Sequence, residues 1–205
     1  RSVTREEARE RISGFAKQAT STAIEALLPE TVSEFQVEAA IKILEGLSGG
    51  PSRAIMISAG TGSGKTLAFY LPVLGYIAAA VNDNPGNGVV ALAIYPRNEL
   101  LKDQFRTLVA SAQSLWVQNS SSRPLSAATW FSLTPYNAKA AMTAWRKISI
   151  NNSHAYICPF LLCPVDDCKG RMAWIEKDLL ASRERLVCVS CGKDVDARFL
   201  RLTRS

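Results

Sequence analysis

The chain has 205 residues, of which 47% are hydrophobic and 20% charged, and its formal net charge is +6. This composition excludes a disordered tail, because the apolar content is sufficient for a core. It also excludes a spanning helix of roughly 18 apolar residues, since Tyr70 and Pro72 interrupt the longest apolar stretch and Asn82 ends it. We therefore expect a cytoplasmic protein with no membrane partner. The positive charge is compatible with a nucleic-acid partner but does not require one.

Two amphipathic helices are predicted in the first fifty residues. Residues 4–7 have capping-box spacing, and apolar residues follow at helical intervals at Ala8, Ile12, Phe15, Ala16 and Ala19. A second helix begins near Ser33. Its apolar face consists of Val37, Ala40, Ile41, Leu44 and Leu47. The Gly-Gly-Pro sequence at 49–51 ends this helix.

Strands and helices then alternate along the chain. The predicted strands are the apolar runs 54–58 and 89–94 and the segment 125–131. The predicted helices are 67–81, 99–113 and 137–147. Turn residues at 82–88 separate the first of these helices from the second strand. Unbroken apolar strands are typical of a parallel sheet that is covered on both faces. The pattern predicts a three-layer α/β domain that binds ligands at the carboxyl ends of its strands.

A glycine-rich loop at residues 59–66 lies between the first of these strands and the helix that follows it. Its glycines let successive backbone N–H groups point at an anion. The helix that follows is expected to begin near Lys65 and adds its positive dipole end. We expect the loop to bind a nucleotide through Gly60, Thr61, Gly62, Ser63, Gly64, Lys65 and Thr66. Lys65 would contact the β and γ phosphates, and the Thr66 hydroxyl would be a ligand of Mg²⁺. These two residues are the predicted catalytic residues.

Four cysteines form two short loops that each turn through a glycine. The sequence predicts a structural Zn²⁺ site with four thiolate ligands, Cys163, Cys168, Cys188 and Cys191. The second pair has the usual C-x-x-C spacing, whereas the first pair is two residues longer. Cys158, which precedes a proline, could replace Cys163, and His154 is a weaker candidate. Four unligated core cysteines are the plainer alternative.

Side chains between the two cysteine pairs allow two interpretations. Trp174, Arg171, Arg183 and Arg185 could contact a nucleic-acid strand by stacking and charge. The simpler interpretation is a small core aromatic residue beneath a solvated basic face.

The glycine-rich loop opens with Ala59 and resembles the A-x-T-G-S-G-K-T form found in superfamily 2 DEAD/DEAH-type helicases. Residues 95–104, Tyr-Pro-Arg-Asn-Glu-Leu-Leu-Lys-Asp-Gln, resemble helicase motif Ia. That likeness implies contact with the nucleic-acid backbone by Pro96, Arg97 and Asn98, although threonine is commoner at the position of Arg97. Gln36 occupies the place of the glutamine that reads adenine in such helicases. It also completes a capping box with Ser33, which is the alternative role.

The resemblance implies the first RecA-like domain of an ATP-dependent helicase or translocase that uses Mg²⁺. The Tyr-Pro opening and the cysteines are similar to the zinc-module branch of DNA helicases and to bacterial anti-phage defence helicases. The implied partners are nucleic acid (DNA rather than RNA), a second RecA-like domain and other defence-system subunits. We expect residues 1–150 to hold the N-terminal helices and the partial RecA-like domain. Residues 151–205 would hold the zinc-ribbon-like insertion and the start of the returning RecA-like segment.

The acidic DExD/H motif of the family is not found in the sequence. Asp166 and Asp167 lie between cysteines, and no apolar strand precedes Asp194. We therefore expect this stretch alone to hydrolyse little ATP. Two other functions are considered: a non-motor nucleic-acid-binding zinc protein with a structural phosphate loop, and a P-loop kinase or GTPase. The latter lacks a separate base-recognition motif.

Overall fold

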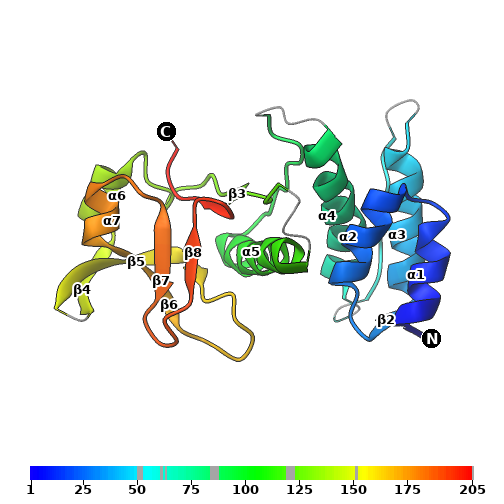
Figure 1. The fold of residues 1–205 in the computed structure, drawn as a ribbon, viewed down its shortest axis with the longest axis horizontal. Coiled ribbons are helices and arrows are strands. Elements are labelled where there is room, and N and C mark those ends of the chain that lie inside the picture. Colours follow the sequence, from blue (N-terminus) through cyan, green and yellow to red (C-terminus); the bar gives the residue numbers. More distant parts are fainter. Residues whose placement is uncertain are drawn as a thin grey trace. The chain divides into compact units, whose positions relative to one another are not determined.

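The structure is a computed structural model that describes residues 1–49, 53–60, 62, 64–83, 88–118, 123–150 and 152–204. For residues 82 and 83 it describes the backbone alone. The chain divides into two compact units (Figure 1). The first comprises residues 1–92 and 114–123, and the second comprises residues 93–113 and 124–205. No helix among the described residues has the length and apolar character needed to cross a membrane.

The described part of the first unit contains the helices α1 to α4, the end of α5 (Asn98–Gln118) and one pair of short strands. The first four helices are α1 (Arg5–Ser13), α2 (Gln18–Leu27), α3 (Glu34–Leu47) and α4 (Lys65–Asp83). Strands β1 (Ser2–Thr4) and β2 (Thr31–Ser33) pair antiparallel. Helix α4 packs against α2 and α3, and Gly75 lets α4 approach Ile24 closely. The core consists of Val3, Ala8, Ile12, Ile24, Leu28, Val32, Val37, Ala40, Leu44 and Leu71.

Local capping signals in this unit are confirmed. Thr4 is the N-cap of α1 and accepts a hydrogen bond from the Glu7 N–H at 3.3 Å. The first helix ends at Ser13, earlier than predicted, and the separate helix α2 follows it. Ser33 and Gln36 form the complete capping box of α3. The helix predicted at 67–81 is α4, which contains Pro72.

Two predicted strands, 54–58 and 89–94, are wrong, because the structure has no strand in either segment. A strand needs a hydrogen-bonded neighbour, and neither segment has one among the described residues. Most of their large side chains are exposed, including Met56 at 94% and Val89 at 87%, and Ile57 is half-buried. The three-layer parallel sheet is therefore not seen in the described part of the chain. Of the predicted turn at 82–88, residues 84–87 lie outside the described residues.

The second unit contains most of the β structure. Strands β4 (Arg146–Ile150), β5 (Ser153–Leu162), β6 (Arg171–Ile175), β7 (Arg185–Cys188) and β8 (Asp194–Asp196) form one antiparallel sheet in sequence order (Figure 1, yellow to red). Helix α7 (Glu176–Leu180) connects β6 to β7. Strands β3 (Ala127–Ala128) and β9 (Leu200–Arg201) form a separate parallel pair. This pair brings the segment after the cysteines back to the segment before them.

The remaining helices agree with the sequence in position but not in length. Helix α5 (Asn98–Gln118) is longer than the predicted 99–113, and its residues up to Gln113 belong to the second unit. Helix α6 (Ala138–Ala144) is shorter than the predicted 137–147, because Arg146 already begins β4. Only residues 127–128 of the predicted strand 125–131 form a strand.

Aromatic rings form much of the core of the second unit. The centre of the Phe160 ring lies 5.7 Å from the centres of the Trp145 and Phe131 rings. It lies 6.1 Å from the centre of the Phe105 ring of α5. Trp174 is fully buried, and its indole N–H donates to the Arg183 carbonyl at 2.8 Å. Trp174 is thus the core aromatic residue of the simpler interpretation, and stacking of Trp174 on a nucleic-acid base is excluded by its burial.

Candidate nucleotide site and metal centre

The glycine-rich loop leads directly into α4, so the helix begins at Lys65 as predicted. The Lys65 ammonium donates to the carbonyls of Ala59 at 2.8 Å and Gly60 at 2.6 Å, which holds it over the loop. Thr66 lies in the first turn of α4, where free N–H groups and the helix dipole favour an anion. Gly62 has a φ of 77° and Gly64 a φ of 71°, a left-handed conformation that favours glycine.

Thr61 and Ser63, also predicted to bind the nucleotide, lie outside the described residues. The arrangement of the other loop residues, with Lys65 at the start of a helix, suits a polyphosphate anion.

Gln36 connects the cap of α3 to the loop. Its Oε1 accepts from the Ser33 N–H at 2.7 Å, and its Nε2 donates to the Gly64 carbonyl at 3.1 Å. A Cβ on residue 64 would overlap the Gln36 amide, so the glycine is required for this approach as well as for its φ. The capping role of Gln36 is therefore realised, and its amide also supports the loop. A role in adenine recognition stays a prediction.

The residues predicted to contact nucleic acid lie at the start of α5. Pro96 and Arg97 precede the helix and Asn98 is its first residue; all three are exposed. The Arg97 carbonyl accepts from the Leu101 N–H at 3.1 Å, which ties the segment to the first turn. Helix α5 therefore carries this segment at its N-terminal end.

The four predicted thiol ligands lie together. The sulfur atoms of Cys163, Cys168, Cys188 and Cys191 are all within 4.8 Å of one another. The Cys163 and Cys191 sulfurs are 3.6 Å apart, and those of Cys168 and Cys188 are 3.7 Å apart. Around a tetrahedral zinc ion with Zn–S bonds near 2.3 Å, sulfurs lie about 3.8 Å apart. The four thiols therefore fit a metal ion such as zinc.

The backbone of both cysteine loops is folded toward this centre. The Cys163 N–H donates to the Gly170 carbonyl at 2.9 Å, and the Gly192 N–H donates to the Cys188 carbonyl at 3.1 Å. Gly192 has a φ of 74°. A Cβ at Gly170 would lie 2.5 Å from the Cys188 sulfur, so only glycine lets the first loop approach the second. Gly170 thus has a packing role, whereas Gly192 supplies the left-handed backbone of the second loop.

The thiols differ in their acidity. Burial raises the pKa of Cys163 to about 12. At Cys188 burial acts in the same direction, but hydrogen bonds from the backbone N–H groups of Cys191 and Ser190 and from neighbouring thiols outweigh it and lower the pKa to about 7. A metal ion binds the thiolate form, so it would add to the charge stabilisation that these N–H groups supply.

The two alternative ligands are not part of the cluster. Cys158 lies on β5, is buried, and has a pKa raised to about 12 by that burial. His154 is an exposed residue near the start of β5. Among the described residues, the group of four sulfurs includes neither of them. The geometry therefore favours Cys163 over Cys158.

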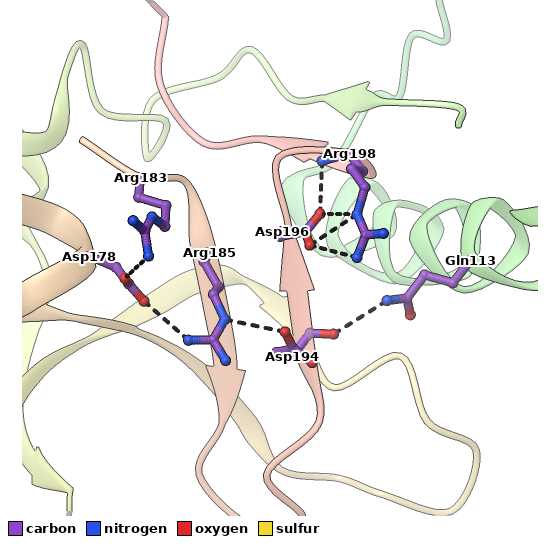
Figure 2. A network of polar contacts seen from close by, with 7 residues as sticks. All are labelled: Gln113, Asp178, Arg183, Arg185, Asp194, Asp196 and Arg198. Carbon is purple, nitrogen blue, oxygen red and sulfur yellow. Dashed lines mark hydrogen bonds and ion pairs between the residues drawn. The ribbon is translucent and has the colours of Figure 1, made fainter. Parts of the chain in front are cut away.

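We call the antiparallel sheet of β4 to β8 the cysteine sheet. A network of polar contacts joins it to helices α5 and α7 (Figure 2). Asp178 of α7 is 5% exposed and pairs with Arg183 at 3.5 Å and Arg185 at 3.4 Å. Arg185 also pairs with Asp194 at 3.2 Å, and the Asp194 carbonyl accepts from Gln113 of α5 at 3.3 Å. Arg183 and Arg185 are thus engaged in structural ion pairs, as in the simpler interpretation of this basic face.

The same network includes a tight pair on β8 and the turn after it. Asp196 accepts from the Arg198 guanidinium at 2.9 to 3.1 Å, and this contact lowers the pKa of the Asp196 carboxyl.

Comparison with known proteins identifies the family. The model of the DEAD/DEAH box helicase family matches residues 33–141, more than half of the chain. The chain belongs to the DEAD/DEAH box helicase family. The matched residues include the capping glutamine, the glycine-rich loop and the start of α5. Membership in this family implies a RecA-like α/β fold and an enzyme of the helicase/ATPase class.

One relative of this helicase chain is the Druantia protein DruE of Escherichia coli (strain UMEA 4076-1). The two are 37% identical over 65 residues, which is 30% of this chain and 4% of the relative. The chain thus spans only a small part of that relative. No solved structure matches it.

Two contacts of the site were not foreseen from the sequence. Arg106 of α5 donates to the carbonyls of Cys163 and Val165 in the first cysteine loop, and the Gln36 amide meets Gly64. Each joins residues distant in the sequence, so no local pattern signals it. The capping box revealed only one of the two roles of Gln36.

Proposed function

We propose that this chain is the ATP-binding part of an ATP-dependent helicase or translocase that acts on nucleic acid, and on DNA rather than RNA. The observation that carries the proposal is the position of Lys65, whose ammonium lies over a glycine-rich loop at the start of α4. Family membership supports the same activity.

In this proposal the loop binds ATP with Mg²⁺. The N–H groups of residues 60–64 and the start of α4 would bind the phosphate oxygens. Lys65 would exchange its two carbonyl partners for the β and γ phosphates, where its positive charge offsets developing negative charge. Thr66, one residue on, would supply its hydroxyl as a Mg²⁺ ligand, and the ion would neutralise phosphate charge when bound.

Gln36 would act beside the phosphates. Its amide holds the Gly64 carbonyl and caps α3. An amide has a second N–H and a second acceptor lone pair, so adenine recognition stays compatible with both contacts. At the start of α5, exposed Pro96, Arg97 and Asn98 would contact the nucleic-acid backbone, with the Arg97 charge attracting phosphate.

The four cysteines would bind Zn²⁺ as a structural site. Four thiolates fill a tetrahedral shell and leave no position for a substrate, so the ion would stabilise the antiparallel sheet and perform no chemistry. Residues 1–150 would then form the N-terminal helices and the partial RecA-like domain. Residues 151–205 would form the zinc-ribbon-like insertion and the start of the returning segment.

The wider context is bacterial defence. Similarity to DruE and the resemblance of the Tyr-Pro motif and cysteines to anti-phage defence helicases support this. The protein would work with a second RecA-like domain and with other subunits of the defence system.

The test is ATP hydrolysis by the full-length protein, with and without single-stranded DNA or RNA. We expect DNA to stimulate the rate, and Lys65→Ala to lower kcat by about 100-fold or more, as for the loss of a group that stabilises the transition state. Lys42→Ala is the matched control, because it removes one charge from the exposed surface of α3. An unchanged rate in Lys65→Ala would contradict the proposal.

A further inference from the structure

Arg106 lies on α5, the helix that begins with the segment assigned to nucleic acid. Its Nε donates to the Cys163 carbonyl at 2.7 Å and its Nη2 to the Val165 carbonyl at 3.1 Å. Both acceptors belong to the first cysteine loop, and Cys163 is itself one of the four clustered thiols. One guanidinium therefore joins α5 to the backbone of the first cysteine loop.

The planar guanidinium suits this task. It presents several N–H donors in a fixed fork, so one side chain can hold two carbonyls at a set spacing. The contact belongs entirely to the second unit, which contains residues 93–113 and 124–205.

Other contacts fix α5 on the same side. Phe105, Val109 and Ala112 recur at helical spacing and are buried, and the Phe105 ring lies against Phe160 of β5. Gln113 is two turns beyond Arg106 and donates to the Asp194 carbonyl of β8 (Figure 2). Besides this apolar packing, the helix thus has polar contacts with the cysteine sheet at two places, one of them the first cysteine loop. The exposed segment 96–98 lies at the N-terminal end of the helix.

We propose that Arg106 is a positioning residue that couples metal binding by the four cysteines to nucleic-acid binding at the start of α5. A bound ion fixes the loop that carries the Cys163 and Val165 carbonyls. Those carbonyls fix Arg106, and Arg106 in turn fixes α5. Arg106 lies about 12 Å along the helix from Asn98, given a rise of about 1.5 Å per residue. Without the ion the loop loses its fixed shape, and the helix loses the polar contact that Arg106 makes. This inference rests on the nucleic-acid role proposed above.

Coupling of this kind is reciprocal. If metal strengthens nucleic-acid binding, nucleic acid must strengthen metal binding by the same factor. Arg106→Ala breaks the connection between them, so it should weaken both. A residue that served stability alone would leave the effect of one ligand on the other unchanged.

The experiment follows zinc release from the full-length protein into a chromogenic chelator, with and without single-stranded DNA, alongside DNA affinity. In the unmodified protein we expect DNA to slow release by about fivefold or more, within the usual range of coupling between sites. In Arg106→Ala we expect faster release without DNA, weaker DNA binding and no slowing by DNA. Lys139→Ala removes the same charge from an exposed position on α6 and should behave as the unmodified protein.

Arg106→Lys keeps the charge and an aliphatic stem but loses the forked guanidinium. It replaces Arg106→Ala in the experiment if that variant does not fold. Equal release rates without DNA in the unmodified protein and the Arg106 variant would overturn the inference. Equal slowing by DNA in both would overturn it too. If DNA does not bind the unmodified protein at all, the proposed function fails, while release without DNA still tests the contact between Arg106 and the cysteine loop.

Discussion

At the scale of single residues, Gly64 is constrained twice. Its φ of 71° is unfavourable for other residues, and an added Cβ would overlap the Gln36 amide. We expect Gly64→Ala to cost about 1–2 kcal/mol from the left-handed backbone alone, and to weaken binding of a fluorescent ATP analogue because the loop must shift. Thermal unfolding and a binding titration measure the two effects.

Gly88→Ala is the control for that substitution. Among the described residues, no atom lies within 4 Å of a Cβ at this position, and its φ lies outside the left-handed range. The variant should keep both stability and nucleotide affinity. Nucleotide affinity in Gly64→Ala equal to that of the control would contradict the role of this glycine.

The choice between Cys158 and Cys163 is also made at single residues. Cys163→Ala should lose bound zinc, because it removes one of the four clustered sulfurs. Cys158→Ala should keep a full zinc content and lose only about 1 kcal/mol of stability from its buried position. Metal content of the purified variants, measured by mass spectrometry, decides between them. Zinc loss in Cys158→Ala with retention in Cys163→Ala would reverse the assignment.

At the scale of elements, the sequence predicted structures that depend on near neighbours. The capping box at Ser33, the start of α4 at Lys65 and the two cysteine loops each lie within a few residues, so their geometry follows from local spacing. The segments 54–58 and 89–94 have the apolar composition of buried strands, but a strand also needs partners distant in sequence. Composition alone could not supply these partners, and neither segment is a strand here.

The sequence did not predict the number of strands in the antiparallel sheet, for a related reason. The cysteine spacing predicted a small ribbon, whereas β4 and β5 extend the sheet to five strands. The pairing of β4 with β5 matches Ile148 with Ala155. It depends on packing of Ala155, Ile157 and Ala173 in a small apolar cluster. Nothing in the metal-binding pattern itself signals those strands.

Helix α7 and strand β7 are held together by one carboxylate. Asp178 is 5% exposed and pairs with two arginines, so Asp178→Ala should lower the free energy of unfolding of this unit by about 2 kcal/mol. Asp194→Ala is the matched control: its side chain is 49% exposed and, among the described residues, forms an ion pair with Arg185 alone, so the cost should be about 0.5 kcal/mol. Chemical denaturation measures both. Equal costs would show that burial of Asp178 adds nothing.

At the scale of the whole molecule, the two candidate sites belong to different compact units. The glycine-rich loop lies in the unit that contains residues 1–92, and the four cysteines lie in the unit that contains residues 124–205. The sequence predicted both sites from their own patterns. It gave no sign of how α5 attaches to the cysteine loop, because Arg106 and Cys163 are 57 residues apart.

This division predicts that the two sites can be lost separately. Removal of zinc with a strong chelator should unfold the antiparallel sheet, since metal binding and folding of small metal centres are linked. Binding of an ATP analogue should persist, because Lys65 and its carbonyl partners belong to the other unit. Lys65→Ala should give the converse, with full zinc content and little nucleotide binding. Circular dichroism and a nucleotide titration on the same samples measure both, and loss of nucleotide binding together with zinc would mean that the units fold as one.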